Sequence, residues 1–307
     1  MKKFADELLA CLRALGFQMR ILHVSRLHHL QEEVESLRNQ TLLDKRFYED
    51  RLACFNFQIP PNFTDAQSLI VVAAPRPQTR AIFIWNGEKH PLIIPPTYTG
   101  YDFVTRRIRN LLDEIISEKG YRSIEALLPL KLLATRSGLG EYGKNNICYV
   151  PGLGSFLQLA GYYSDMPCEE DAWQEEAIMK SCEGCELCRL ACPTNAITKE
   201  RFLLHAERCV SYHNEKKGDI EFPIWMDVSS HNCVVGCMRC QRVCPQNRDF
   251  MDWIGDEETF TEKETALILE HTGREKLPRE TLRKLENLDL LDYLDSLPRN
   301  LGIFFSK

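Results

Sequence analysis

The 307-residue sequence lacks three features that mark large classes of protein. It has no long uncharged apolar run, so no segment is expected to span a membrane. Asp6, Glu7 and Arg13 interrupt the apolar N-terminal residues and no small-residue cleavage site follows, which predicts an amphipathic helix rather than a secretory signal. Positive charge is not in excess either, since the formal net charge is −6, and this argues against a general nucleic-acid binder.

Cysteine is the residue that stands out by its presence. Nine of the 13 cysteines lie between Cys182 and Cys244. They include two runs that end in Cys-Pro, namely Cys182, Cys185, Cys188, Cys192-Pro193 and then Cys237, Cys240, Cys244-Pro245. A [4Fe–4S] cluster needs four converging thiolates, and a two-residue spacing lets one tight loop supply three of them. The runs therefore predict two [4Fe–4S] clusters.

The ligands can be divided between the clusters, because in two-cluster ferredoxins the cysteine before proline binds the other cluster. The first cluster then takes Cys182, Cys185, Cys188 and Cys244. The second takes Cys192, Cys237, Cys240 and a fourth cysteine, for which Cys209 and Cys233 are candidates. We favour Cys209, because Cys233 lies four residues before Cys237, outside the two-residue spacing. Paired zinc sites or a disulfide framework are the alternatives, although zinc sites rarely carry a four-cysteine run closed by proline.

Thiols that bind iron must stay reduced, which predicts a cytoplasmic location. The cysteines outside the cluster region have no ligand spacing and are interpreted as small core residues. They are Cys11, Cys54, Cys148 and Cys168.

Apolar periodicity predicts helices and strands on both sides of the cysteines. The expected helices are 3–15, 26–50, Phe103–Lys119, Leu127–Thr135, Glu262–Glu270 and Arg279–Leu297. The expected strands are Ser68–Ala74, Arg80–Trp85, Pro91–Ile94, Ile147–Val150 and Ser155–Tyr163. Asn86-Gly87 favours a type I′ turn between the second and third strands, with Glu88, Lys89 and His90 lengthening the connection.

A glycine-rich stretch runs from Gly138 to Asn145, with the sequence Gly-Leu-Gly-Glu-Tyr-Gly-Lys-Asn. Three glycines in six residues permit positive φ angles and let main-chain amides approach a bulky or anionic ligand, next to the charge of Lys144. The spacing is not that of a dinucleotide fingerprint, and no strand leads directly into it. A sharp turn between a helix and a strand is the alternative interpretation.

From about residue 60 to 250, these features in this order resemble epoxyqueuosine reductases and their relatives, the cobalamin-dependent reductive dehalogenases. The matching residues are Tyr101-Asp102-Phe103-Val104, Ser137-Gly138-Leu139-Gly140, Gly143-Lys144-Asn145, Gly154-Ser155-Phe156, Ser164-Asp165, both Cys-Pro runs and Cys209-Val210-Ser211-Tyr212. The resemblance implies an α/β (α+β) fold, in which a nitroreductase-like cobalamin-binding domain precedes a ferredoxin-like double [4Fe–4S] domain.

The implied organisation has four segments. They are an N-terminal helical segment at 1–60, the nitroreductase-like domain at 61–175, the cluster domain at 176–250 and a C-terminal helical cap at 251–307. The resemblance also implies that cobalamin lies against Ser137, Gly138, Leu139, Gly140, Gly143, Lys144 and Asn145. Lys144, Tyr101 and Tyr142 are expected near the substrate.

The implied function is an electron relay. A low-potential donor such as a ferredoxin or flavodoxin reduces the clusters, which reduce cobalamin, which in turn reduces a small-molecule or modified-nucleoside substrate. The alternative is a cobalamin-free electron-transfer protein that reduces a partner protein or its cofactor.

Two departures separate the sequence from epoxyqueuosine reductases. Those enzymes carry an aspartate upstream of the glycine stretch as proton donor. Counting back from Gly140 without a gap places Ile124 at the position of this aspartate. If the alignment shifts by one residue, Glu125 takes the position, and it could act as the proton donor because partial burial can raise a carboxyl pKa. Glu141 also replaces a usually aromatic residue. The acidic tail after Asn247 is too short for the helical-repeat domain that longer members use to hold tRNA, so tRNA is a disfavoured partner.

Overall fold

The computed structural model describes residues 2–98 and 100–305, and it separates into two compact units. The first unit combines Met1–Pro75, Asp102–Glu186 and Lys199–His205. The second combines Arg76–Tyr101, Leu187–Thr198 and Ala206–Lys307. Among the described residues, no helix is long and apolar enough to cross a membrane.

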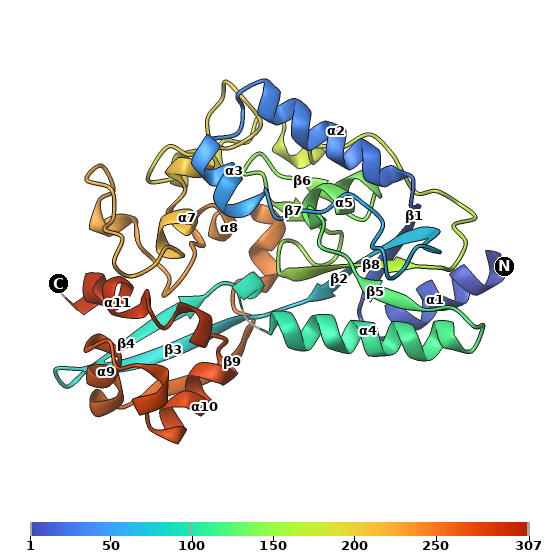
Figure 1. Cartoon of the computed structure of the whole chain (residues 1–307). Helices are drawn as coiled ribbons and strands as arrows, with labels where there is room; N and C mark the ends of the chain where they lie inside the picture. Colours follow the sequence, from blue (N-terminus) through green and yellow to red (C-terminus); the bar gives the residue numbers. More distant parts are fainter. Residues whose placement is uncertain (1, 99, 306–307) are drawn as a thin grey trace. The chain divides into compact units, whose positions relative to one another are not determined.

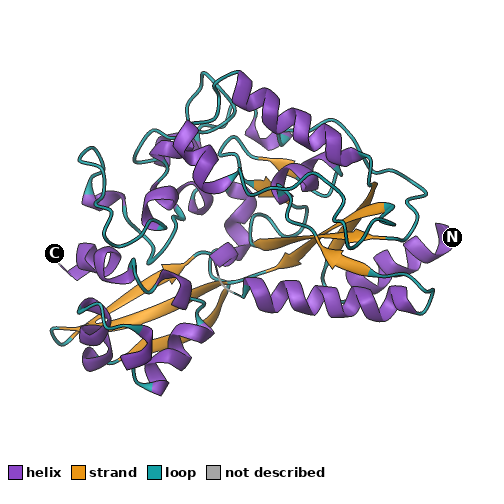
Figure 2. Cartoon of the chain, in the orientation of Figure 1, coloured by secondary structure: helices purple, strands orange, loops and turns teal. Residues whose placement is uncertain are grey.

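The first unit is built on a four-stranded antiparallel sheet in the order β1-β2-β8-β5 (Figures 1 and 2). Its strands are β1 (Gln18–His23), β2 (Ser68–Pro75), β5 (Ser123–Glu125) and β8 (Leu157–Ser164), with a separate short hairpin of β6 (Glu141–Tyr142) and β7 (Cys148–Tyr149). Its helices are α1 (Lys2–Ala14), α2 (Arg26–Asn39), α3 (Lys45–Arg51), α4 (Tyr101–Ser117) and α5 (Leu130–Arg136).

Two cores form on the two faces of this sheet because successive side chains of a strand point in opposite directions. In β2, Leu69 and Val71 join a core with α2 and α5, whereas Ile70 and Val72 join a core with α1 and α4. Figure 1 shows these helix pairs on opposite sides of the sheet. Each fully buried side chain of this size contributes about 1.5–3 kcal/mol. The first unit is therefore a three-layer α/β/α arrangement.

The second unit contains a three-stranded sheet in the order β4-β3-β9. The strands are β3 (Gln78–Trp85), β4 (Glu88–Ile94) and β9 (Ile254–Phe260). Asn86 and Gly87 have φ angles of 52° and 77°, as a two-residue type I′ turn requires. The predicted lengthening of this turn is wrong, because Glu88 pairs with Trp85 and the two residues that follow also belong to β4.

The remaining helices of the second unit either contain or adjoin cysteines or pack against the sheet. They are α6 (Leu187–Ala191), α7 (Val210–Asn214), α8 (Arg239–Arg242), α9 (Glu262–Leu269), α10 (Arg279–Asn287) and α11 (Leu297–Phe305). Short 3₁₀ helices across the chain are Pro96–Tyr98, Lys180–Cys182, Ala206–Arg208, Val228–Ser230, Pro245–Phe250, Arg274–Lys276 and Leu291–Tyr293. Helices α9, α10 and α11 share one core with the β3–β4 hairpin and β9.

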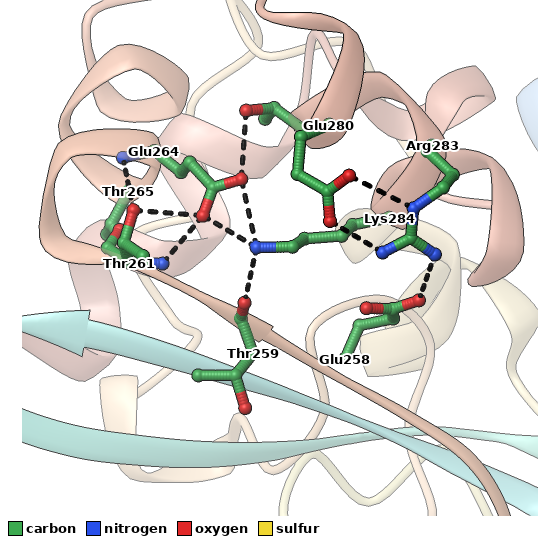
Figure 3. Close-up of polar contacts among 9 residues, drawn as sticks. Glu258, Thr259, Thr261, Glu264, Thr265, Glu280, Arg283 and Lys284 are labelled. Atoms are coloured by element: carbon green, nitrogen blue, oxygen red, sulfur yellow. Dashed lines mark hydrogen bonds and ion pairs between the residues drawn. The ribbon is translucent and has the colours of Figure 1, made fainter.

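An ion pair between Glu264 of α9 and Lys284 of α10 ties these helices to β9 (Figure 3). Lys284 Nζ lies 2.8 and 3.0 Å from the two Glu264 carboxylate oxygens and donates to the Thr259 carbonyl at 2.8 Å. Thr261 and Thr281 also donate to this carboxylate. Burial opposes ionisation of Glu264, but the hydrogen bonds from Lys284 and Thr261 outweigh it and lower its pKa below the ordinary value.

The α/β class is as predicted, but the units divide the chain differently from the four expected segments. The expected N-terminal helical segment also contains β1, which pairs with β2. The expected C-terminal helical cap contains β9, which pairs in parallel with β3 and so joins the hairpin at 78–94 to the C-terminal residues.

Candidate functional site

Four cysteines expected to bind the second cluster lie in the second unit. Cys192 follows α6, Cys209 is the N-cap of α7, Cys237 precedes α8, and Cys240 lies within α8. Burial raises the pKa of Cys240 well above its ordinary value, and the neighbouring thiols of Cys237, Cys209, Cys192 and Cys188 raise it further. The four predicted ligands are therefore close enough for their charges to interact.

This group of cysteines fits an iron–sulfur cluster chemically. Burial is the main cause that raises the pKa of Cys209 to about 11, so a thiolate there needs compensating positive charge, which iron supplies. Within the described residues, no three His, Cys, Asp or Glu side chains converge on the position of a single metal ion. A [4Fe–4S] cluster distributes its thiolates over several irons, so its ligands need not meet around one ion.

Cys233, the other candidate for the fourth ligand, has a different environment. It is 1% exposed, and its Sγ lies 3.0 Å from Asn232 Oδ1. A β-bridge joins its backbone to Ile93. Burial and the neighbouring Cys237 thiol raise its pKa. Cys209, in contrast, interacts with both Cys237 and Cys192.

The cysteines expected to bind the first cluster are divided between the units, with Cys182 and Cys185 in the first and Cys188 and Cys244 in the second. Locally, Cys185 N–H donates to the Cys182 carbonyl at 3.1 Å, and Gly184 has a φ of 68°. These features make the tight loop that the spacing predicted.

Lys144 from the glycine stretch contacts this cysteine loop. Its Nζ donates to the Cys185 carbonyl at 3.0 Å and lies 3.4 Å from Glu186 Oε1. A charge-assisted hydrogen bond thus connects the glycine stretch to the cysteine loop, which follows it in the sequence. The expected place of Lys144 near the substrate stays a prediction.

The packing of the protein itself accounts for the three glycines. A Cβ atom added at any of the three would be too close to a neighbouring atom. At Gly138 it would lie 2.8 Å from the Gln174 side chain, at Gly140 it would lie 2.6 Å from the Tyr149 carbonyl oxygen, and at Gly143 it would lie 2.6 Å from Asn145 Oδ1. Gly138 also has a φ of 66°, which ends α5.

Polar groups of the stretch bond within the protein as well. The amides of Gly138, Leu139, Gly140 and Gly143 donate to carbonyls of α5 or of the β6–β7 turn. Ser137 Oγ donates to the Ala134 carbonyl at 2.9 Å, and Asn145 Nδ2 donates to the Tyr149 hydroxyl at 2.8 Å. The local geometry is that of a rigid turn, and contact with cobalamin stays a prediction.

The other predicted catalytic residues lie in different surroundings. Tyr142 is 6% exposed, and burial raises its pKa. Tyr101 is 43% exposed at the start of α4, where it ends the 76–101 segment of the second unit, whereas Tyr142 belongs to the first. Glu125 is exposed on β5, opposite Tyr162 of β8. Their catalytic roles stay predictions.

Sequence reasoning missed Asn232, whose side-chain amide lies against Cys237 Sγ. Its only signal in the sequence is its position five residues before that cysteine.

Comparison with known proteins first defines the class. Residues 181–247 match the family described as the 4Fe-4S double cluster binding domain. The chain is therefore an iron–sulfur protein with a double-cluster domain, as the cysteine runs predicted.

Curated relatives then show which iron–sulfur proteins the chain is similar to. The epoxyqueuosine reductase of Synechococcus sp. (strain RCC307) is 30% identical over 59% of this chain and 57% of its own length. That of Bacillus subtilis (strain 168) is 29% identical over 56% of this chain and 42% of its own length. The matches thus span about half the length of these curated relatives.

Solved structures extend the similarity to the fold. A crystal structure of an epoxyqueuosine reductase with an epoxyqueuosine-modified tRNA stem loop covers 98% of this chain and 80% of its own, with a TM-score of 0.71 and 21% identity. The enzyme from Streptococcus thermophilus gives a TM-score of 0.67 at 18% identity, over 97% of this chain and 80% of its own. The resemblance predicted from the motifs is confirmed, and the chain is an epoxyqueuosine reductase-like iron–sulfur protein.

Proposed function

We propose that the chain is a reductase in which two [4Fe–4S] clusters pass single electrons to a bound cobalamin. The observation that carries the proposal is the grouping of Cys192, Cys209, Cys237 and Cys240 inside a chain with the epoxyqueuosine reductase fold. Cobalamin supplies a metal centre that cycles between oxidation states, which two-electron reduction of an organic substrate requires.

The ligand assignment follows the sequence rule. Cys182, Cys185, Cys188 and Cys244 hold the first cluster, and Cys192, Cys209, Cys237 and Cys240 hold the second. The interaction of Cys209 with both Cys192 and Cys237 supports its place in the second set. Lys144 holds the loop of the first cluster through the Cys185 carbonyl. A low-potential ferredoxin or flavodoxin supplies the electrons.

The substrate class that the relatives suggest is a modified nucleoside, and tRNA that carries epoxyqueuosine is the first one to test. The cluster-loaded protein with cobalamin is incubated anaerobically with this tRNA and a low-potential reductant, and the digested nucleosides are analysed by mass spectrometry. Conversion of epoxyqueuosine to queuosine supports the proposal. Unchanged epoxyqueuosine, with both clusters reduced and cobalamin bound, excludes this substrate and favours another small organic molecule.

A second function is an electron-transfer protein without cobalamin, which reduces a partner protein. The observation that favours it is the use of the glycine-stretch amides in bonds within the protein. Cobalamin binding separates the two functions, because the second requires both clusters but no corrin.

A further inference from the structure

The side-chain amide of Asn232 contacts one of the sulfurs assigned to the second cluster. Nδ2 donates to Cys237 Sγ at 3.1 Å. Oδ1 accepts from the Met238 N–H at 2.9 Å and lies 3.0 Å from Cys233 Sγ. A backbone N–H can only donate, so the bond from Met238 determines which end of the amide is oxygen and directs the NH₂ group at the sulfur.

The loop that carries Asn232 is held in place within the second unit. Val234 N–H donates to the Ile93 carbonyl at 3.0 Å, and Asn300 Nδ2 donates to the Val234 carbonyl at 2.9 Å. Asn300 comes from α11, so a C-terminal helix fixes this loop. The amide therefore meets the sulfur from a supported position, as residues that orient metal ligands do.

Other sulfurs of the same set also have polar neighbours. Thr194 Oγ1 lies 3.7 Å from Cys192 Sγ. Ser211 bonds Cys209 through both its backbone and its side chain. Asn232 differs from these residues because its second bond fixes the direction of its N–H groups.

We propose that Asn232 is a positioning residue that raises the reduction potential of the second cluster. Reduction adds one electron from the donor, breaks no bond and moves no proton, so the reduced cluster carries one more negative charge. A hydrogen bond donated to a ligand sulfur stabilises that charge more in the reduced state than in the oxidised state. The inference rests on the ligand set of the proposed function and is independent of cobalamin.

Two substitutions test the hydrogen bond. Asn232→Asp keeps an oxygen for the Met238 N–H but replaces the Nδ2 group, which donates to Cys237 Sγ and to the Ser230 carbonyl at 3.3 Å, with a carboxylate oxygen. Asn232→Ala removes every hydrogen bond of the side chain. Each variant is reconstituted anaerobically as the full chain and titrated with dithionite, with the potential of each cluster followed by electron paramagnetic resonance. The Cys182→Ser variant identifies the signal of the first cluster.

Both Asn232 variants should shift the second cluster to a more negative potential, with the larger shift for aspartate, while the first cluster stays unchanged. The expected size is about a tenfold change in the ratio of oxidised to reduced cluster, which is about 59 mV for a one-electron couple.

Lys284→Met is the control for lost stability, because Lys284 pairs with Glu264 and bonds the Thr259 carbonyl, neither of which belongs to the loop that carries Asn232. It should lower the melting temperature and leave the potential unchanged. The proposal is overturned if both Asn232 variants hold two clusters at the wild-type potentials. Loss of the second cluster from both variants also overturns it, in favour of a purely structural role. If the wild-type protein binds only one cluster, the assignment of the cysteines to two clusters in the proposed function is refuted.

Discussion

Replacement of Lys284 by methionine tests the packing of the C-terminal helices against β9. The substitution keeps most of the side-chain volume but leaves the Glu264 carboxylate without its cation, and each side chain is only 11% exposed (Figure 3). Removing one partner of a buried ion pair costs about 3–5 kcal/mol. Glu264 keeps hydrogen bonds from Thr261 and Thr281, so we expect the lower end, about 3 kcal/mol.

The assay is thermal unfolding of the cluster-loaded chain near neutral pH. At about 2–4 °C per kcal/mol, the melting temperature should fall by roughly 6–12 °C. Arg283→Met is the matched control from the same helix, because Arg283 is half exposed and pairs with the exposed Glu280 as well as with Glu258. It should change the melting temperature far less. Equal effects of the two substitutions would refute the buried-pair reasoning.

The same pair predicts a pH dependence. The pKa of Glu264 is lowered in the folded chain, so its contribution is complete above the unfolded pKa and is lost as pH falls through the folded pKa. The pKa of Glu264 in the unfolded chain and its lowered pKa in the folded chain both lie in the acidic range. The wild-type chain should therefore keep this contribution between about pH 6 and 8 and lose it only in acid, and its loss within this window, measured as the stability difference from Glu264→Gln, would contradict the lowered pKa.

Three further predictions concern the site. Cys209→Ser should lose about half of the bound iron while Cys233→Ser keeps it, and the opposite result would exchange their roles. Gly140→Ala should lower the melting temperature, because its Cβ would lie 2.6 Å from a backbone oxygen, whereas Gly302→Ala, with open space around it, should not. Lys144→Met should speed loss of the first cluster to a chelator about fivefold, equivalent to ~1 kcal/mol, and an unchanged rate would show that its bond is dispensable.

Elements with a strong local signal could be predicted from the sequence. Leu69–Ala74 is uniformly apolar because β2 is covered on both faces, and Asn86-Gly87 specifies its turn chemically. In contrast, β9 has the sequence IGDEETF, and only Phe260 of that strand is buried. Its pairing with β3, far away in sequence, makes it a strand, and no local pattern carries that information.

In the site, too, features set by neighbouring residues could be predicted and features set by distant residues could not. Cysteine spacing predicted the double-cluster domain because ligand geometry constrains neighbouring residues directly. The contact of Asn232 with Cys237 depends on a loop conformation set by Ile93 and Asn300, and spacing alone could not predict it. The glycine stretch allowed two interpretations because a glycine needed for internal packing and one needed for a ligand look identical in sequence.

Cobalamin binding tests the proposed function most directly. The chain is reconstituted with iron and sulfide, titrated anaerobically with cobalamin, and then treated with a low-potential reductant, while the visible spectrum is recorded. We predict that binding changes the cobalamin spectrum, and that the reductant then produces the spectrum of reduced cobalamin. An unchanged cobalamin spectrum alongside two intact, reducible clusters would contradict the proposal and leave an electron-transfer protein.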